Sequence, residues 1–434
     1  MADVRPFRGL RFDPSAIDPS LAIAPPYDVI SPAEQRALYH RSPHNIVRID
    51  YGEQSDGDSA SDNRYTRAAR DLEDWRRDGV LTRDAAPAFY AYEQEYTWEG
   101  RRFRRQHYFA AVRLEEWDKG IIKPHEHTLS GPKADRLDLL RATSTQVSPV
   151  YCLYRAKQGL PPLAAIAGKP VYDFEADGQR HALSAITAEA DVAVIAKHLA
   201  GCDVYIADGH HRYETALKYR DECRARSASW SGDEPENFVL MALTEAADPG
   251  LLVLPTHRTL APTALPEGVI GKLSRYLSVE PLPLADDDPA DALARLSSLA
   301  SGNTAFLAVG LEPDVTHLLV LKDRAAIEQL MPVAQPESWK RLDVSVLQYA
   351  ILNHIFGVDD AALTAGGAVS YTQDARLACE NVASGAASAA FLLNATPVEQ
   401  VLAVSDDGGR MPQKSTFFYP KLPTGLVMNT LPPN

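Results

Sequence analysis

The chain has 434 residues, 45% of them hydrophobic, and a formal net charge of −14. It can bury one large core or two to three smaller ones. The acidic balance excludes a protein that binds nucleic acid non-specifically, because such a protein needs a positive field. Four widely spaced cysteines without a C-x-x-C pair argue against a zinc site or a disulfide framework and favour the cytoplasm. An apolar run of about 18 residues is missing, so we expect no membrane span.

The first quarter of the chain predicts two helices and a β-hairpin. Ser31 caps a helix through Tyr39, with a proline at its first position. A second helix is expected over 61–77. Aromatic residues alternate along 87–114 on both sides of Glu99-Gly100, which predicts a hairpin with an exposed tip.

The middle of the chain predicts a polar loop over 123–136, then a short helix and the apolar strand 149–154. A helix around 192–199 precedes a strand, a tight turn and a helix that together span 204–224. Two further strands are expected after a surface loop, over 238–243 and 251–255.

The pattern changes near residue 262. An acidic loop, Asp286–Asp288, separates two helices, and a hairpin over 304–321 follows. Leu342–Phe356 predicts an amphipathic helix, and Ala389–Leu393 predicts a strand. The mixture of hairpins and helices predicts an α+β or mixed α/β protein. We expect two domains, a core over 1–260 and an α/β region over 261–434 that packs on it.

The group Asp208-Gly209-His210-His211-Arg212 lies between the predicted strand and helix. A helix N-terminus offers unpaired N–H groups and roughly half a positive charge. Gly209 lets the backbone approach a ligand closely, and Arg212 can form paired hydrogen bonds to phosphate oxygens. Asp208 is a candidate metal ligand or base, and His210 or His211 a candidate donor to a phosphoryl group. The alternative is that Asp208 only caps the helix and the histidines lie on the surface.

A second group gathers charge on the predicted loop 123–136, with two imidazoles, two carboxylates and three cations. Its members are Lys123, His125, Glu126, His127, Lys133, Asp135 and Arg136. If the segment is extended, His125 and His127 lie on one side, which suits a metal, although no third ligand is evident. Acid–base chemistry, phosphate positioning and a solvated charged loop remain open alternatives.

Three smaller groups complete the candidates. Lys414-Ser415-Thr416 is similar to the end of a P-loop but lacks the glycine spacing, which leaves Lys414 alone as a candidate ligand contact. The double proline before Tyr27 and Asp28 holds both rigidly, as a structural turn or as the wall of a site. His257-Arg258 follows a predicted strand end and is typical of a surface feature.

These motifs, taken in order, resemble the bacterial and archaeal family known as domain of unknown function 1015. The resemblance spans nearly the whole chain. It rests on Pro25–Ile30, His125–Thr128 with Asp135-Arg136, Ala207–Ala216, Leu342–Val344 and Met411–Thr416. The family name conveys no activity.

The turn at Asp208–Arg212 is also similar to the phosphate-binding turn of the ParB/sulfiredoxin superfamily, and most of all to that of its free-serine kinases. The resemblance implies a ParB/sulfiredoxin-like nucleotide-binding core with large additions. It implies that Gly209, His210, His211 and Arg212 bind nucleotide and that Asp208 lies beside the transferring phosphate. Those kinases use an N-terminal glutamate as base, for which Asp28 is the candidate here. Other superfamily members are CTP-hydrolysing switches, sulfinic-acid reductases and nucleases, so phosphate binding is implied more firmly than any reaction.

The leading hypothesis is a kinase that uses ATP or ADP with Mg²⁺ to phosphorylate a small hydroxyl-bearing metabolite such as a free amino acid. Asp28, Asp208 or Glu126 would accept the hydroxyl proton. The remaining cationic candidates, Lys123, His125, Lys133, Arg136 and Lys414, would hold phosphate or stabilise the transition state. The alternatives are a nucleotide-binding regulatory or scaffold protein without transfer activity, and a metal-dependent hydrolase built on His125 and His127. A homodimer stays open.

Overall fold

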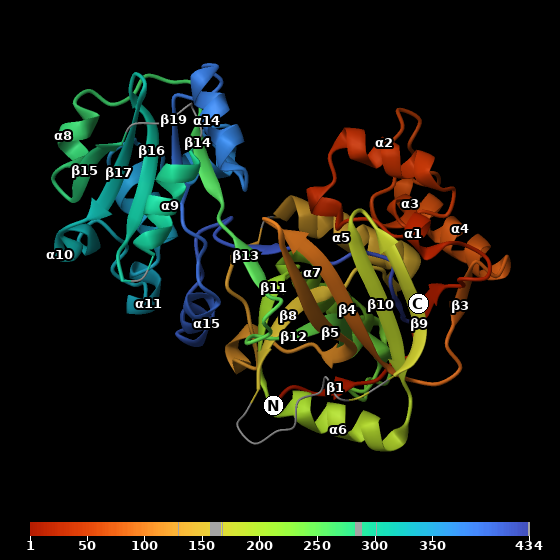
Figure 1. The fold of residues 1–434 in the computed structure, drawn as a ribbon. Coiled ribbons are helices and arrows are strands. Elements are labelled where there is room, and N and C mark those ends of the chain that lie inside the picture. Colours follow the sequence, from red (N-terminus) through yellow and green to blue (C-terminus); the bar gives the residue numbers. More distant parts are fainter. Residues whose placement is uncertain (129, 157–165, 167, 283–288, 301, 433–434) are drawn as a thin grey trace. The chain divides into compact units, whose positions relative to one another are not determined.

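The computed structural model describes residues 1–128, 130–156, 166, 168–282, 289–300 and 302–432. The chain forms two compact units (Figure 1). The first unit comprises Met1–Pro124, Thr128–Leu251 and Pro420–Asn434, and the second comprises His125–His127 and Leu252–Tyr419. The predicted acidic loop Asp286–Asp288 lies outside the described residues. The division into domains 1–260 and 261–434 stays a prediction.

A mixed sheet forms the centre of the first unit. Its strand order is β6-β11-β8-β12-β5-β4-β10-β9, and β1 pairs with β5. The strands are β1 (Val4–Arg5), β4 (Phe89–Trp98), β5 (Arg101–Arg113), β6 (Ile122–Lys123), β8 (Val150–Arg155), β9 (Lys169–Ala176), β10 (Gln179–Ile186), β11 (Asp203–Asp208) and β12 (Phe238–Glu245). Two short pairs lie beside it, β2 (Leu10–Phe12) with β3 (Leu81–Arg83) and β7 (Thr145–Gln146) with β21 (Asn429–Thr430).

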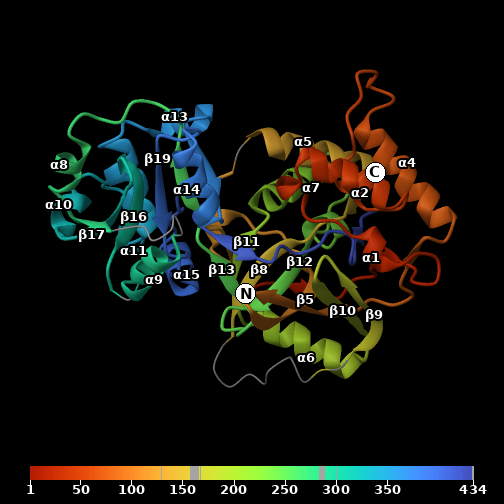
Figure 2. The ribbon, with the colours of Figure 1, turned by 45° about the horizontal axis from the view of Figure 1, so that its top comes forward.

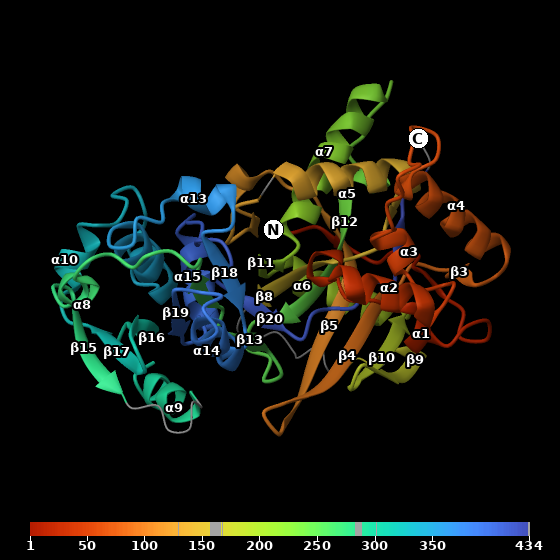
Figure 3. The same ribbon diagram turned by 90° about the horizontal axis from the view of Figure 1, so that it is seen from above.

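Helices cover this sheet and extend beyond it. They are α1 (Pro19–Ala22), α2 (Pro32–Arg41), α3 (Val47–Asp50), α4 (Arg64–Arg77), α5 (Ser130–Thr143), α6 (Glu189–Ala200) and α7 (His210–Arg226). Among the described residues, 3₁₀ turns span Tyr27–Val29, Trp117–Lys119 and Pro235–Asn237. Helix α5 contacts both α4 and α7 (Figure 3). Helix α6 lies along the sheet beneath β5 and β10 in the view of Figure 2.

The strand residues alternate between two buried faces. On one face, Val204 and Ile206 of β11 pack in a core with Ile195 of α6 and Tyr213 of α7. The opposite face carries buried polar side chains, including Arg105, whose guanidinium donates to Gln94 and to the Pro420 carbonyl at 2.7 Å each. Burial on both faces is typical of a strand at the centre of a layered protein.

The returning segment 420–432 adds backbone pairing to the first unit. Thr424 forms a bridge with Ala24 and Met428 with Leu10, and Leu431 N–H donates to the Ser144 carbonyl at 2.8 Å. Together with β21, these bonds join the segment to three regions that lie within the first 150 residues of the chain.

The second unit has three layers, in which helices cover both faces of an antiparallel sheet of order β15-β17-β16-β19-β14-β18. The strands are β14 (His257–Leu260), β15 (Leu277–Leu282), β16 (Ala305–Glu312), β17 (Val315–Leu321), β18 (Val369–Thr372) and β19 (Ala389–Leu393). Helices α9 (Ala290–Ser298) and α14 (Ala375–Ala383) share one core with the sheet, while α8 (Val269–Leu273), α11 (Glu337–Lys340), a π-helix (Val346–Asn353) and α15 (Val398–Asp406) contribute to the other. The unit also holds α10 (Arg324–Glu328), α12 (Asp343–Ser345), α13 (Asp360–Ala365) and the pair β13 (Leu252–Leu254) with β20 (Phe417–Tyr419).

The mixed α/β class and the main local elements agree with the sequence predictions. The hairpin turns at Glu99-Gly100, and Ser31 forms a capping box with Glu34 at the start of α2. The predicted strand–turn–helix becomes β11 and α7. No helix in the described ranges is both long and apolar enough to cross a membrane.

Three local predictions are wrong wholly or in part. The polar loop 123–136 contains the start of α5 at Ser130, because a proline in the first turn of a helix does not interrupt it. The predicted amphipathic helix Leu342–Phe356 is present as a helix, but it is largely a π-helix and is buried on most of its surface rather than on one face. His257 and Arg258 are 2% exposed within β14, so they are core residues rather than a surface pair.

Candidate functional site

The turn between β11 and α7 begins at a break in strand pairing. Ile206 pairs with Cys152 and Asp208 with Tyr151, so the register shifts by one residue between them. Such a bulge re-aims the side chain that follows it. Gly209, with φ of 91°, is the N-cap residue of α7, and no side chain caps the helix. Asp208 is therefore the last residue of the strand, and the interpretation of Asp208 as a simple helix cap is wrong.

The Asp208 carboxylate is held by two cations. Lys421 Nζ lies 2.8 Å from Asp208 Oδ2, and Arg212 Nη2 lies 3.6 Å from Oδ1. All three side chains are less than one-fifth exposed. Burial alone would raise the pKa of Asp208, but the charges of Lys421 and Arg212 outweigh it and lower the pKa below its ordinary value. Asp208 is therefore ionised at neutral pH and is a weak proton acceptor.

Arg212 folds back over the turn. Its Nη1 donates to Ser148 Oγ at 2.8 Å and also to the Pro149 carbonyl. A Cβ atom on Gly209 would lie 2.8 Å from Arg212 Nε, so the guanidinium would have to move from its bonds to Ser148 and Pro149. Glycine is also the residue that adopts a positive φ at little cost. The turn thus places a guanidinium, a lysine and a helix N-terminus around one carboxylate.

A second charge cluster lies next to this turn. Arg136, on α5, is 7% exposed and donates from Nη1 to Asp50 Oδ1 at 2.9 Å. Its Nε donates to Asp135 Oδ2 at 2.7 Å. Burial raises the pKa of Asp50, and the charges of Arg136 and Arg212 partly oppose this rise. The guanidinium of Arg136 also lies 3.9 Å above the ring of Tyr27, in cation–π geometry.

Hydroxyl groups connect the two clusters. Thr424 Oγ1 lies 3.3 Å from Asp50 Oδ2 and 3.2 Å from Ser148 Oγ, which accepts from Arg212. Residues from α3, α5, the β7–β8 connection, the β11–α7 turn and the returning C-terminal segment therefore form one polar network. The Pro25–Asp28, Asp135-Arg136 and Asp208–Arg212 motifs all contribute to it.

The exposed carboxylate of Asp28 acts on His211 in the first turn of α7. Burial lowers the pKa of His211, while the charges of Asp28 and Glu214 raise it and that of Lys133 lowers it. The imidazole is therefore mainly neutral at pH 7. Lys133 Nζ donates to Glu214 Oε2 at 2.9 Å and to Thr128 Oγ1 at 3.0 Å, so this lysine is held beside α7.

His210 and Lys123 complete the candidates within the first unit. His210 is buried, and its charge contributes to lowering the pKa of Asp208. Lys123 ends β6 next to β11, and its Nζ lies 5.1 Å from the centre of the Tyr205 ring. His210 thus lies in the first turn of α7, and Lys123 lies on the strand that pairs with β11.

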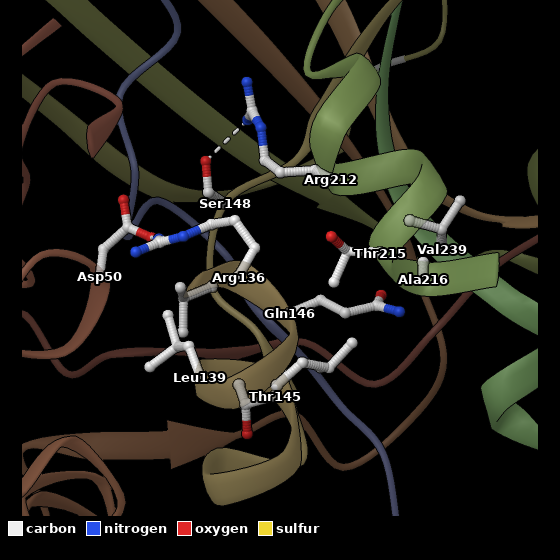
Figure 4. Close-up of a pocket in the computed structure, with 12 residues that line it drawn as sticks. Asp50, Arg136, Leu139, Thr145, Gln146, Ser148, Arg212, Thr215, Ala216 and Val239 are labelled. Carbon is white, nitrogen blue, oxygen red and sulfur yellow. Dashed lines mark hydrogen bonds and ion pairs between the residues drawn. The ribbon is translucent and has the colours of Figure 1, made fainter. Parts of the chain in front are cut away.

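A cavity opens beside the network, between α5 and α7 (Figure 4). Asp50 and Arg136 face each other on one side, and Arg212 points away from Thr215 toward Ser148. The lining residues are Asp50, Arg136, Leu139, Leu140, Thr145, Gln146, Val147, Ser148, Arg212, Thr215, Ala216 and Val239. The cavity offers about 50 Å³ to water centres, room for a few waters at roughly 10–15 Å³ each.

The remaining sequence candidates belong to the second unit. His125 is 1% exposed, and its Nε2 lies 3.0 Å from Thr416 Oγ1 and 3.6 Å from Glu126 Oε1. Lys414 is exposed and has φ of 56°, and its carbonyl accepts from Arg258. That His125, Glu126 and Lys414 share a pocket with Arg212 stays a prediction.

The described residues contain no cluster of side chains that would support a metal-dependent hydrolase. Within the described part of the chain, no three His, Cys, Asp or Glu side chains are arranged to hold an ion. His125 and His127 alone do not form such a site, because a catalytic zinc commonly takes three protein ligands.

Sequence reasoning missed Lys421. It selected Lys414 from the C-terminal motif, yet the lysine that reaches Asp208 is Lys421, seven positions later. No local pattern marks this residue, because its role depends on where the C-terminal segment crosses the first unit. The same holds for Ser148 and Thr424, which are ordinary hydroxyl residues in the sequence.

Residues 4–345 match the family described as "Protein of unknown function (DUF1015)". The chain belongs to this family, as its motifs indicated. No curated protein matches the sequence.

Several solved structures are similar over most of the chain. A mutant free serine kinase in complex with ADP shares 13% identity and a TM-score of 0.37, with 75% of this chain and 92% of that chain covered. A free serine kinase in complex with AMP shares 14% identity and a TM-score of 0.36 over the same shares. A conserved hypothetical protein from Pyrococcus furiosus shares 14% identity and a TM-score of 0.35, covering 74% and 94%. These scores are too low to establish a common fold.

Proposed function

We propose that the first unit binds the phosphates of ATP or ADP at the turn between β11 and α7 and transfers a phosphoryl group to the hydroxyl of a small metabolite such as a free amino acid. The observation that supports it most is the set of groups around Asp208: an uncapped helix N-terminus, Arg212 and Lys421. Phosphoryl transfer depends on positioning and positive charge more than on covalent chemistry, and this set provides both.

The phosphate-binding part of the proposal rests on Gly209, His210, His211 and Arg212. Backbone N–H groups at the start of a helix carry partial positive charge and favour anions. Arg212 is held by Ser148 and Pro149, so its guanidinium is already oriented before a ligand arrives. Lys421 is the lysine that we assign to contact the phosphoryl group during its transfer. Lys133 and Arg136 supply further positive charge nearby.

The donor chemistry also fits a magnesium ion held together with the nucleotide. Mg²⁺ is commonly bound by one or two carboxylates plus substrate phosphates, rather than by a cage of protein ligands. Asp208 is ionised and is the carboxylate we assign to it. Bound there, the ion would neutralise phosphate charge.

Asp28 is the proposed proton acceptor. The acceptor hydroxyl loses its proton as its oxygen bonds to phosphorus and the nucleotide leaves with the electrons of the broken P–O bond. Asp208 is unsuited to this task because its pKa is lowered by Lys421 and Arg212. Asp28 is exposed and faces the neutral imidazole of His211, which can relay or orient the proton.

The fold is part of the proposal. We infer that the β11–α7 region with its supporting strands is a ParB/sulfiredoxin-like nucleotide-binding core to which the chain adds large segments. Glu126, His125 and Lys414 then act with this core only if the two units bring them to it.

The test is direct incubation of the protein with ATP or ADP, Mg²⁺ and a panel of small alcohols that includes free serine. Phosphorylated product is measured by ³¹P NMR. Replacing Lys421 with Met should lower kcat/KM by about 100-fold or more, the size of effect seen when one transition-state donor is removed. Lys169→Met, which removes an exposed lysine of β9 in the same unit, is the matched control and should retain activity. Absence of product across the whole panel would refute the kinase.

A second candidate is a nucleotide-binding protein without transfer activity. Ion pairs inside the unit favour this candidate, because cations that are already neutralised are less able to stabilise a transition state. Asp208 pairs with Lys421 and Arg212, and Arg136 pairs with Asp50 and Asp135. Calorimetry separates the two candidates: tight ADP binding that Arg212→Ala abolishes, with no turnover of ATP, supports the binding protein.

A further inference from the structure

The second unit contains a larger cavity that the proposed function does not use. It offers about 400 Å³ to water centres, against about 50 Å³ beside Arg212. Small-molecule sites commonly have volumes of roughly 300–1,000 Å³. Its lining residues all belong to the second unit and come from several regions of it: His127, Pro332, Gln335, Gln348, Tyr349, Asp360, Leu363, Thr364, Tyr371 and Arg410–Gln413.

Two sequence motifs that the phosphate site leaves unexplained meet at this cavity. His127 comes from the histidine-rich segment, and Met411-Pro412-Gln413 from the C-terminal motif. Met411 N–H donates to the His125 carbonyl at 2.7 Å, and Glu126 forms a β-bridge with Met411. The two segments therefore support each other and fix this wall of the cavity.

A π-helix, Val346–Asn353, also lines the cavity and contributes Gln348 and Tyr349. Helices of this type are rare and occur often at functional sites. The ring of Tyr349 packs 5.1 Å from that of the buried Trp339, whose indole N–H donates to the Arg410 carbonyl at 2.8 Å. Trp339 thus connects the π-helix to the Arg410 backbone.

The chemistry of the lining is polar and carries both signs of charge. Arg410 provides a guanidinium and Asp360, at the start of α13, a carboxylate. Gln348 and Gln413 provide amides, each with donors and acceptors that match a peptide group. Tyr349 and Tyr371 provide rings with a polar end, and Met411 and Leu363 an apolar floor.

We propose that this cavity binds a zwitterion of about dipeptide size. Arg410 receives its carboxylate, Asp360 receives its ammonium group, and the glutamine amides bind the peptide bond between them. A planar guanidinium is suited to a carboxylate because it donates two parallel hydrogen bonds. The proposal is independent of phosphoryl transfer, since it concerns only residues of the second unit.

Isothermal titration calorimetry of the full chain with a panel of dipeptides, without nucleotide, tests the proposal. For the tightest dipeptide, Asp360→Asn and Arg410→Gln should each weaken binding at least tenfold. Gln413→Glu should weaken it as well, because it replaces an amide that binds the peptide bond with a charged group that cannot donate to it. Asp291→Asn and Arg275→Gln remove exposed charges elsewhere in the same unit and should leave the affinity unchanged.

Two further measurements keep the result interpretable. Amide-capped and N-acetylated forms of the same dipeptide should each lose affinity, independently of any variant's stability. Binding should persist in Asp208→Asn, which separates this site from the phosphate site. No binding by any dipeptide, or equal binding of capped and uncapped forms, would overturn the proposal.

Discussion

Replacing Lys421 with Met tests whether Asp208 depends on this lysine. Lys421 Nζ lies 2.8 Å from the carboxylate, and Arg212 lies 3.6 Å from it. At an effective dielectric constant of about 20, the attraction lost is about 6 kcal/mol, while about 5 kcal/mol of attraction to Arg212 remains. Because the lysine no longer has to be desolvated, the net loss of unfolding free energy should be about 3 kcal/mol, the lower end of values for a broken buried pair.

The stability lost in the Lys421→Met variant should be larger at pH 7 than at pH 4. In the wild-type protein the pKa of Asp208 is lowered, so its contribution to stability is complete above about pH 4, its ordinary pKa, and is lost only in stronger acid. Without Lys421, burial still raises the pKa of Asp208 and Arg212 is the main charge left to lower it, so the pKa rises from its wild-type value. The variant can then relieve its penalty by binding a proton, so the difference from wild type should shrink as pH falls from 7 to 4.

Urea unfolding followed by circular dichroism, fitted with one transition for each unit, measures both effects. Lys421→Arg keeps the charge and should retain most of the stability. Lys414→Met removes an exposed lysine and should change the free energy of unfolding by about 0.5 kcal/mol or less. If Lys421→Met costs no more than Lys414→Met, or if its cost is the same at pH 7 and pH 4, the reasoning about Asp208 is wrong.

Three other predictions follow from single contacts. Gly209→Ala should cost about 1–2 kcal/mol of strain and lower ADP affinity at least tenfold by calorimetry. Gly232 also has a positive φ, 92°, but open space around its Cβ, so Gly232→Ala should cause strain without changing ADP affinity. Arg136→Met should cost about 3–5 kcal/mol in urea unfolding because it leaves Asp50 buried without its partner, and a double variant with Asp50→Asn should recover part of this loss. Burial lowers the pKa of His257 to about 4, so the second unit should lose up to about 3 kcal/mol between pH 6.5 and pH 4, and His257→Gln should remove that slope in pH-dependent unfolding.

Local sequence signals identified the elements but not the partners of the site. The strand, Gly209 and helix α7 follow from one continuous stretch of sequence, as does the hairpin at Glu99-Gly100. Lys421 could not be found in this way, because its contact with Asp208 spans 213 residues. Spacing along the chain contains no information about a contact that depends on the path of a distant segment.

The burial of individual polar side chains also could not be predicted from the local sequence pattern. His125 was expected on an accessible loop, yet its imidazole is packed among Thr416, Glu126 and Phe418. His257 and Arg258 were expected on the surface and lie inside β14. Polar residues become core residues when neighbouring segments supply their hydrogen bonds, and those segments are distant in sequence.

The path of the chain also determines when the phosphate site can form during synthesis. Asp208 leaves the ribosome long before Lys421, with the whole stretch 252–419 translated between them. Until residues 420–432 emerge, β7 lacks its partner strand and Asp208 lacks one of its two cations. The first unit is thus completed only after the second has been made, so premature termination anywhere in the second unit would leave an acidic, partly assembled first unit for chaperones and proteases to recognise.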